Sequence, residues 1–393
     1  MPTIAGVNGA QDTTPEHERS WREVARVFIP IGVFGFGGPA AHIALMRDAV
    51  VRRRGWVDDR TFLDLVGACA LVPGPNSTEL ALHLGLRRAG WRGMTAAAVC
   101  FILPAVVIVT AIAVLYDRYG QTPTGLDLSA GIIPVIVAIV AHAVVGLART
   151  AVNGVTTGAA ALGSALLWLV GANELLLLAA SAVVVVAARH RPRRLDRTNA
   201  IMLPLLAATA AELDHQRSVD LLRLGWVFLK VGAVLYGSGY VLITFLEHDL
   251  VERLGWLTER QLLDAVAVGQ FTPGPVFTTA TFVGYQIAGA AGAVIATVAI
   301  FAPAFVFVAF LGRITHRIRN TPWAASALDG VTASSLGLMA AVGVRLADGA
   351  LVDLPTWSLA GGALIVLVVW TPNTAWLVLF GAAVGLIRPA IGV

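Results

Sequence analysis

Charged side chains are scarce in this sequence. Only 13% of its 393 residues are Asp, Glu, Lys or Arg, and 57% are hydrophobic. Soluble domains carry about 25% charged residues, because polar side chains must cover their surface. This shortage excludes a cytosolic enzyme, a disordered tail and a nucleic-acid-binding protein. It predicts an integral membrane protein that crosses the bilayer many times.

Cysteines and catalytic motifs are also sparse. The two cysteines, Cys69 and Cys100, lie in apolar stretches and predict no disulfide framework. We find no phosphate-binding loop, no nucleophile constellation and no cluster of metal ligands, so we expect no enzyme activity, cofactor or metal. Without a nucleotide site, an ATP-driven pump is excluded within this chain, which leaves a secondary carrier or a channel.

Long apolar runs recur along both halves of the chain. A helix needs about 20 apolar residues to cross the hydrocarbon core. We therefore expect an all-α polytopic fold with about five crossings in each half. The candidate spans are 24–46, 94–116, 131–149, 153–170 and 174–189, then 221–247, 291–312, 327–347, 356–371 and 374–388.

Two pairs of shorter apolar segments are interrupted by a proline-glycine-proline turn. Segments 61–72 and 76–88 flank the first turn, and segments 261–272 and 276–290 flank the second. Each pair predicts a broken helical hairpin that enters the membrane and returns to the same side. Irregular backbone is tolerated at such depth only inside protein or beside a water-filled cavity. We therefore expect both hairpins at a transport site.

The two halves match each other at a nearly constant offset of 200 residues. Gly55-Trp56 corresponds to Gly255-Trp256, and Pro73-Gly74-Pro75 corresponds to Pro273-Gly274-Pro275. The constant register indicates an internal duplication. We divide the chain into a polar N-terminal tail (1–20), a first repeat (21–188), a basic linker (189–220) and a second repeat (221–393). The tail lacks the basic and apolar regions of a signal peptide.

The distribution of arginine predicts that the two repeats have opposite orientations in the membrane. Positively charged loops face the cytoplasm, so a reversed charge bias means reversed sides. Arginines are concentrated in 47–60 and 87–92 but not in 117–129, whereas in the second half they follow residue 312 and are fewer in 247–260 and 287–292. We expect 47–60 at the cytoplasmic side and 247–260 at the periplasmic side.

This inverted arrangement places the N-terminus outside the cell if 24–46 crosses the membrane. The alternative is that the segment is broken at Gly35-Phe36-Gly37-Gly38-Pro39 and does not cross simply.

The hairpin turns are candidate anion sites. Pro75 and Pro275 suit the first turn of a helix, so a short helix is expected to start after each. The free N–H groups and positive dipole at a helix start attract anions. Hydroxyl and amide side chains follow, namely Asn76, Ser77 and Thr78 in one half and Thr278 and Thr279 in the other. The alternative is that these side chains only cap the helices.

A glycine-rich break near the start of the first repeat is a further candidate for substrate contact. Gly37 and Gly38 allow the backbone to approach a ligand closely, and Pro39 interrupts a regular helix. His42 is an ionisable group at membrane depth, which favours a functional role. The alternative is a notch for tight helix packing.

Three ionisable side chains are candidates for coupling and charge compensation. Glu79 and His83 share one helix face, and their counterparts Thr279 and Val283 are not ionisable. This pair suits proton coupling, with a salt link from Glu79 to Arg87 as the alternative. Lys230 lies within an apolar span, where it either neutralises an anion or extends to the membrane surface.

The ordered motifs resemble those of the chromate ion transporter family. The first half contains Phe36-Gly37-Gly38-Pro39-Ala40-Ala41-His42-Ile43 and Pro73-Gly74-Pro75-Asn76-Ser77-Thr78-Glu79, and the second contains Phe228-Leu229-Lys230-Val231-Gly232 and Pro273-Gly274-Pro275. The resemblance covers about residues 20 to 390, as in the long two-domain members. It implies chromate efflux from the bacterial cytoplasm, driven by ion gradients.

We therefore expect a secondary transporter that exports chromate, or a similar tetrahedral oxyanion such as sulfate, and confers chromate resistance. It is expected to lie among the lipids of the bacterial cytoplasmic membrane, with protons as a candidate coupling ion and a homodimer left open. The alternatives are a passive anion channel, a membrane sensor, or a sulfate or molybdate carrier. A channel should show rings of one charge sign, which this sequence lacks.

Overall fold

The computed structural model describes residues 20–36, 38–69, 72–190, 220–235, 241–311, 322–370 and 374–387. Within these ranges every regular element is a helix. Most of the expected tail and linker, together with Gly37, lie outside the described residues.

The helices of the two halves follow the same order. The first half contains α1 (Trp21–Phe34), α2 (Gly38–Arg47), the π-helix η2 (Asp48–Arg52), α3 (Asp59–Cys69), α4 (Asn76–Tyr119), α5 (Pro123–Ala151), α6 (Val155–Leu169) and α7 (Glu174–Arg189). The second half contains α9 (Leu221–Val234), α10 (Val241–Leu246), the π-helix η4 (Glu247–Arg253), α11 (Glu259–Phe271), the 3-10 helix η5 (Val276–Thr278), α12 (Thr279–Leu311), α14 (Pro322–Ala350), α15 (Leu354–Trp370) and α16 (Thr374–Ile387).

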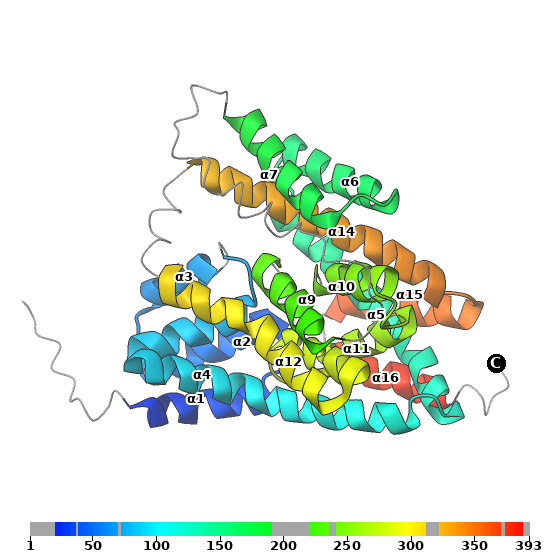
Figure 1. Cartoon of the computed structure of the whole chain (residues 1–393), viewed down its shortest axis with the longest axis horizontal. Helices are drawn as coiled ribbons and strands as arrows, with labels where there is room; N and C mark the ends of the chain where they lie inside the picture. Colours follow the sequence, from blue (N-terminus) through cyan, green and yellow to red (C-terminus); the bar gives the residue numbers. More distant parts are fainter. Residues whose placement is uncertain are drawn as a thin grey trace, which may run out of the picture.

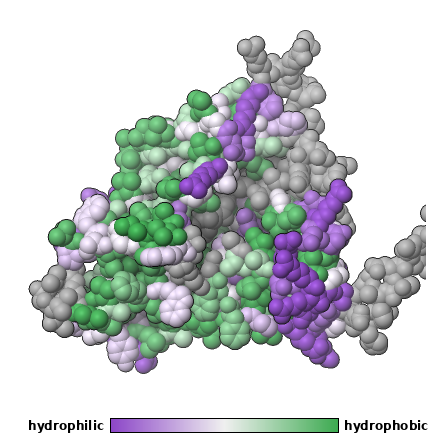
Figure 2. Space-filling view, turned by 180° about the vertical axis from the view of Figure 1, so that it is seen from behind, coloured by the Kyte–Doolittle hydropathy of each residue, from purple (hydrophilic) through white to green (hydrophobic). Residues whose placement is uncertain are grey.

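The described helices confirm a multi-pass membrane fold. The four that are long and apolar enough to cross a bilayer are α4, α5, α14 and the segment Val276–Ala309, which includes most of α12. In Figure 1, α4, α12 and α14 run across the molecule from left to right. Figure 2 shows a broad hydrophobic surface with hydrophilic residues gathered toward its edges. Such an apolar exterior suits contact with lipid.

The first expected span of each half is not one helix. This corrects the prediction of single spans 24–46 and 221–247, and it agrees with the alternative of a break at Gly35-Phe36-Gly37-Gly38-Pro39. The chain breaks between α1 and α2, and again between α9 and α10. At the start of α1, the Glu23 carboxylate accepts a hydrogen bond of 2.9 Å from Trp56 Nε1 and pairs with Arg88 Nη2 at 2.8 Å. The segment from Trp21 to Trp56 therefore begins and ends at the same face of the molecule. The N-terminal end of α1 lies with the arginine-rich segments 47–60 and 87–92.

The hairpin segments re-enter as expected, because α4 and α12 each reverse direction at a bend. Gly90 and Gly289 have nearly identical backbone angles at the two bends, with φ 60° in both. A Cβ atom built on Gly85 would lie 2.4 Å from the carbonyl oxygen of Gly93. Residues eight apart in a straight helix are separated by about 12 Å. The residues before and after the bend therefore pack against each other.

Equivalent loops of the two halves lie at opposite faces. Arg260 Nη2 donates to the Leu126 carbonyl at 3.2 Å, and Gln286 Nε2 donates to the Ala113 carbonyl at 3.4 Å. The start of α11 thus lies beside the start of α5, and the bend of α12 lies beside the far part of α4, away from the bend of α4. This arrangement has the inverted topology that the arginine distribution predicts.

The two halves also pack into each other. Helix α5 contacts α15 and α16 of the second half, and α14 contacts α6 and α7 of the first. Backbones approach closely at both places, since a Cβ atom on Gly131 would lie 2.0 Å from the Gly381 oxygen, and one on Gly330 would lie 2.5 Å from the Ser181 oxygen. Helix α5 of the first half and helix α14 of the second are therefore each covered by helices of the other half.

Cysteine labelling tests the orientation of these faces in the membrane. In a variant without Cys69 and Cys100, a single cysteine in 47–60 should react with an impermeant reagent only from the cytoplasmic side. One in 247–260 should react only from the periplasmic side. The measurement is mass-tag labelling of intact cells and inverted vesicles. Labelling of both positions from the same side would contradict the inverted arrangement.

Candidate oxyanion site

Both hairpin turns meet the broken first segment of the opposite half. The Gly74 N–H donates to the carbonyl of Leu235, directly after α9, at 2.7 Å. The Gly274 N–H donates to the carbonyl of Gly35, directly after α1, at 3.0 Å. These reciprocal bonds follow a twofold relation between the halves. They place each hairpin turn beside the interrupted first segment of the other half, inside the molecule.

The start of α4 presents buried polar atoms beside the first hairpin turn. Thr78 and Glu79 are at most 1% exposed, and Ser77 is also buried. Among the described residues, Asn76 Oδ1, Thr78 Oγ1 and Glu79 Oε1 are buried without a hydrogen-bond partner. Each such group costs about 1–3 kcal/mol unless something satisfies it. Their clustering in the first turn of one helix indicates a place where a polar ligand binds.

His42 on α2 lies beside the second hairpin turn. Its Nε2 lies 2.8 Å from the carbonyl oxygen of Gly35, the same carbonyl that accepts from Gly274. The ring packs edge-on against Phe101, with 5.1 Å between centroids, and Nδ1 is buried without a partner. Gly38 begins α2 at φ 75°. The predicted glycine-histidine motif is therefore a neighbour of the second hairpin turn.

The second hairpin turn differs from the first. The Thr278 hydroxyl donates to the Pro275 carbonyl, and the Thr279 hydroxyl donates to the Val276 carbonyl, both at 2.8 Å. These protons are used within the turn, so the site is asymmetric. The role of both threonines as donors to an anion remains a prediction.

His83 and Lys230 occupy different surroundings. His83 is half-buried, one turn after Glu79 on α4. Lys230 is buried on α9 and forms an ion pair with Asp249 of η4, so it does not simply extend to the membrane surface. Asp249 is not predicted from the sequence, because its segment 247–260 has the composition of a charged loop. The carboxylates Glu247 and Asp249 directly follow the largely apolar run 241–246, and this position is a signal that could have indicated a buried acidic residue.

Asp264 on α11 has structural surroundings. Asp264 accepts a hydrogen bond from the Tyr116 hydroxyl of the other half at 2.6 Å. Its ion pair with Arg260 Nε is long, at 3.9 Å. Within the described ranges, no group of three or more His, Cys, Asp and Glu side chains could hold a metal ion.

Comparison with known families identifies the relatives of this fold. The family model described as chromate transporter matches residues 22–186 and again residues 222–386. The chain belongs to the chromate transporter family. The resemblance drawn from the sequence motifs is therefore confirmed, and the protein is a multi-pass protein of the bacterial cell membrane.

Curated members of this family align with nearly the full chain. A chromate transport protein of Cupriavidus metallidurans is 29% identical, over 98% of this chain and 97% of its own length. A chromate transport protein of Pseudomonas aeruginosa is 30% identical, over 84% of this chain and 82% of its own. A probable chromate transport protein of Synechococcus elongatus is 29% identical, over 88% of this chain and 89% of its own. No solved structure matches the chain.

Proposed function

We propose that this protein is a secondary active transporter that exports chromate, or a similar tetrahedral oxyanion such as sulfate, and thereby confers chromate resistance. The observation that carries the proposal is the group of buried polar atoms without partners at the first hairpin turn, which contacts the broken first segment of the other half. The names of the curated relatives support chromate as the substrate. We assign the two halves of the site to repeats 21–188 and 221–393.

The proposed binding site is built mainly from the first half. The amides of Asn76, Ser77 and Thr78 belong to the first turn of α4, where N–H groups have no partner within the helix and the dipole favours an anion. The Asn76 and Thr78 side chains and the His42 ring add polar contacts. Gly37 and Gly38 let the backbone approach the substrate. Thr278 and Thr279 join the site when they release their carbonyl partners, and Lys230 supplies a positive charge.

Proton coupling is assigned to Glu79 and His83. A dianion that leaves an inside-negative cell is already driven outward by about 2.3 kcal/mol per charge per 100 mV. A proton is thus not needed to drive export, and it sets the direction of transport and the return of the carrier. Glu79 suits this role because its carboxyl lies against the hairpin turn, where a Cβ atom on Gly74 would lie 2.4 Å from Glu79 Oε1. A charged carboxylate there would repel the anion, whereas the protonated form donates to it.

Flux measurements in proteoliposomes test the proposed function. We expect labelled chromate and sulfate to move through the purified protein, and a pH gradient to drive either anion above its equilibrium concentration. A passive channel would bring the anion only to equilibrium. Absence of flux for both anions would contradict the proposal.

Replacing Glu79 with glutamine mimics the protonated carboxyl. We expect Glu79→Gln to keep anion binding, measured as a thermal shift with sulfate, and to flatten the pH dependence of flux between about pH 5.5 and 8. The matched control is Asp59→Asn, which neutralises an exposed carboxylate paired with Arg47 at the surface. An unchanged pH profile in Glu79→Gln would make Glu79 a structural partner of the turn only.

A further inference from the structure

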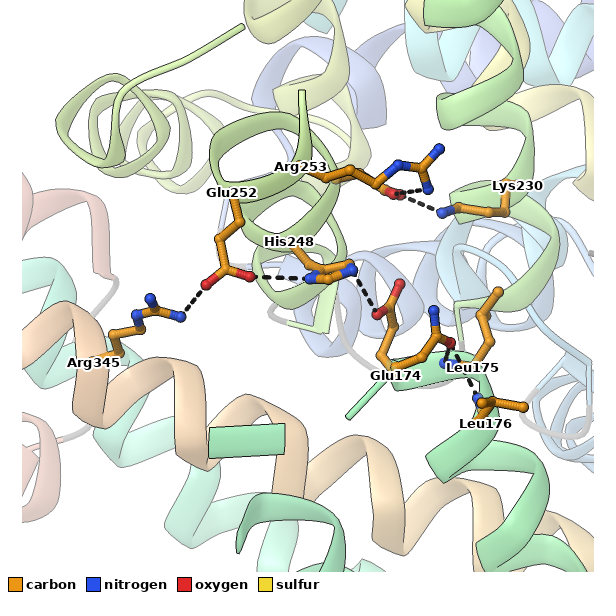
Figure 3. Close-up of polar contacts among 10 residues, drawn as sticks. Glu174, Leu175, Leu176, Lys230, His248, Glu252, Arg253 and Arg345 are labelled. Carbon is orange, nitrogen blue, oxygen red and sulfur yellow. Dashed lines mark hydrogen bonds and ion pairs between the residues drawn. The ribbon is translucent and has the colours of Figure 1, made fainter. Parts of the chain in front are cut away.

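Lys230 and Asp249 form a buried ion pair inside the membrane fold. Lys230 is the only lysine in the chain. It is 9% exposed on α9, and Asp249 on η4 is 1% exposed. Figure 3 shows Lys230 extended toward the carboxylate that Arg253 also approaches. Burying two charges in a protein costs free energy that their attraction does not always return. The pair therefore calls for an explanation beyond stability.

The fold itself does not require this pair. At the 200-residue offset, the first half has Pro30 and Ala49 in the corresponding positions. The π-helix is still present there as η2, and its acidic residue Asp48 pairs with Arg53 at 2.7 Å on the surface. The same local structure thus forms without a buried lysine or a buried aspartate.

The pair lies close to the proposed anion site. Lys230 precedes Leu235 by five residues, which is about 7.5 Å of helix rise. The Leu235 carbonyl accepts the Gly74 N–H of the first hairpin turn. The only lysine ammonium of the chain is therefore near the place where the proposed function puts the oxyanion, but a carboxylate of the protein already holds it.

We propose that Asp249 is an internal substitute for the substrate, which neutralises Lys230 while the site is empty and releases it to the oxyanion when substrate binds. The inference rests on the proposed function and adds to it a residue that controls the empty carrier. The exchange replaces one anionic partner of Lys230 with another, so that the ammonium is never buried without a counter-charge.

Arg253 remains as a counter-charge for the Asp249 carboxylate after Lys230 is released. Its Nη1 lies 3.5 Å from Asp249 Oδ1, the oxygen that Lys230 does not contact. Other charged groups of the described residues form a separate chain on the other side of η4. In it His248 lies 3.4 Å from Glu174 and 3.0 Å from Glu252, and Arg345 contacts Glu247 and Glu252. Glu259 also acts on Glu247 and Arg345. Asp249 therefore stays paired as an anion, and its release of Lys230 requires no proton.

Removing the substitute should separate substrate binding from the return of the empty carrier. In Asp249→Asn, Lys230 lacks its counter-ion when the site is empty. The variant should bind the oxyanion at least tenfold more tightly, because the anion now fills a vacant position. The empty carrier should return slowly to the side where it binds substrate, because it must pass through the closed state with a buried ammonium that has no counter-charge. Net efflux should fall at least tenfold, whereas one-for-one exchange of anion across the membrane should remain within about twofold of wild type.

The experiment compares net efflux and exchange of labelled sulfate in proteoliposomes, for wild type, Asp249→Asn and the control Asp48→Asn. Thermal shift with sulfate provides a second measurement, in which sulfate should raise the melting temperature of Asp249→Asn more than that of wild type. The thermal shift reports sulfate binding even if Asp249→Asn is less stable than wild type and gives little flux. Asp48→Asn should behave as wild type in both.

The outcomes distinguish this inference from the proposed function. If wild-type protein neither moves nor binds sulfate or chromate, the proposed function fails. If wild type transports but Asp249→Asn loses exchange and net efflux equally, or loses neither, the role of Asp249 as a substitute is wrong. A sulfate-induced shift no larger than that of wild type would overturn it as well.

Discussion

Replacing Lys230 with methionine is expected to abolish oxyanion transport and to lower the free energy of unfolding by about 3–5 kcal/mol, because it leaves Asp249 buried without its closest counter-charge. Methionine has a similar shape and no charge. Flux in proteoliposomes measures the first effect, and chemical or thermal denaturation in detergent measures the second. The expected loss of stability exceeds that of most single substitutions.

The double variant Lys230→Met/Asp249→Asn separates the two effects. Since neither partner is then charged, stability should return to near the wild-type value, whereas transport should stay absent because the cation for the substrate is missing. Wild-type flux in the double variant would show that the pair serves structure alone. Lys230→Arg keeps the charge and is expected to keep part of the activity.

The second large effect is expected at the hairpin turn of the second repeat. Gly274 has φ 87°, and a Cβ atom there would lie 2.7 Å from the Cβ of Ala105 in the other half. Gly274→Ala should therefore push the turn away from Gly35, whose carbonyl accepts the Gly274 N–H. We expect transport to fall at least tenfold and stability to fall by about 1–3 kcal/mol. Flux and melting temperature measure the two changes.

Gly255→Ala is the matched control for this substitution. Gly255 also has a positive φ, 62°, but no atom lies within 4 Å of the position of its Cβ. Gly255→Ala therefore introduces the same strain of a positive φ as Gly274→Ala, but its Cβ collides with no neighbouring atom. If both variants lose the same amount of transport, the close contact between the halves at Gly274 is not important for function.

Most of the architecture follows from local signals in the sequence. The proline-glycine-proline turns and the constant register of Gly55-Trp56 with Gly255-Trp256 predict the broken hairpins and the duplication. The arginine count predicts that equivalent loops lie at opposite faces. These features depend on residue types with strong conformational or membrane preferences. The break at Gly35 was open in the sequence, since only the contact of Glu23 with Trp56 and Arg88 decides that this segment returns to its starting face.

The partners of individual side chains could not be predicted in the same way. The Lys230–Asp249 pair joins two helices across 19 residues, and no periodic pattern marks it. The position of Thr278 matches that of Thr78, but a short 3-10 turn in the second half lets Thr278 and Thr279 donate to carbonyls at i−3. Side-chain hydrogen bonds of this kind depend on the exact turn, which composition and spacing do not specify.

The packing of α5 against α15 and α16, and of α14 against α6 and α7, has a consequence for how such a chain could have evolved. A gene that encoded only one repeat would produce a chain in which the helix equivalent to α5 or α14 lacks the helices that pack against it in the present protein. Two copies could build the present contacts only after insertion into the bilayer in opposite orientations. Fusion of two such genes would fix the two orientations in equal number, and each half would then be free to change its sequence separately. The lysine in the second repeat and the glutamate-histidine pair in the first are differences of the kind that this freedom allows.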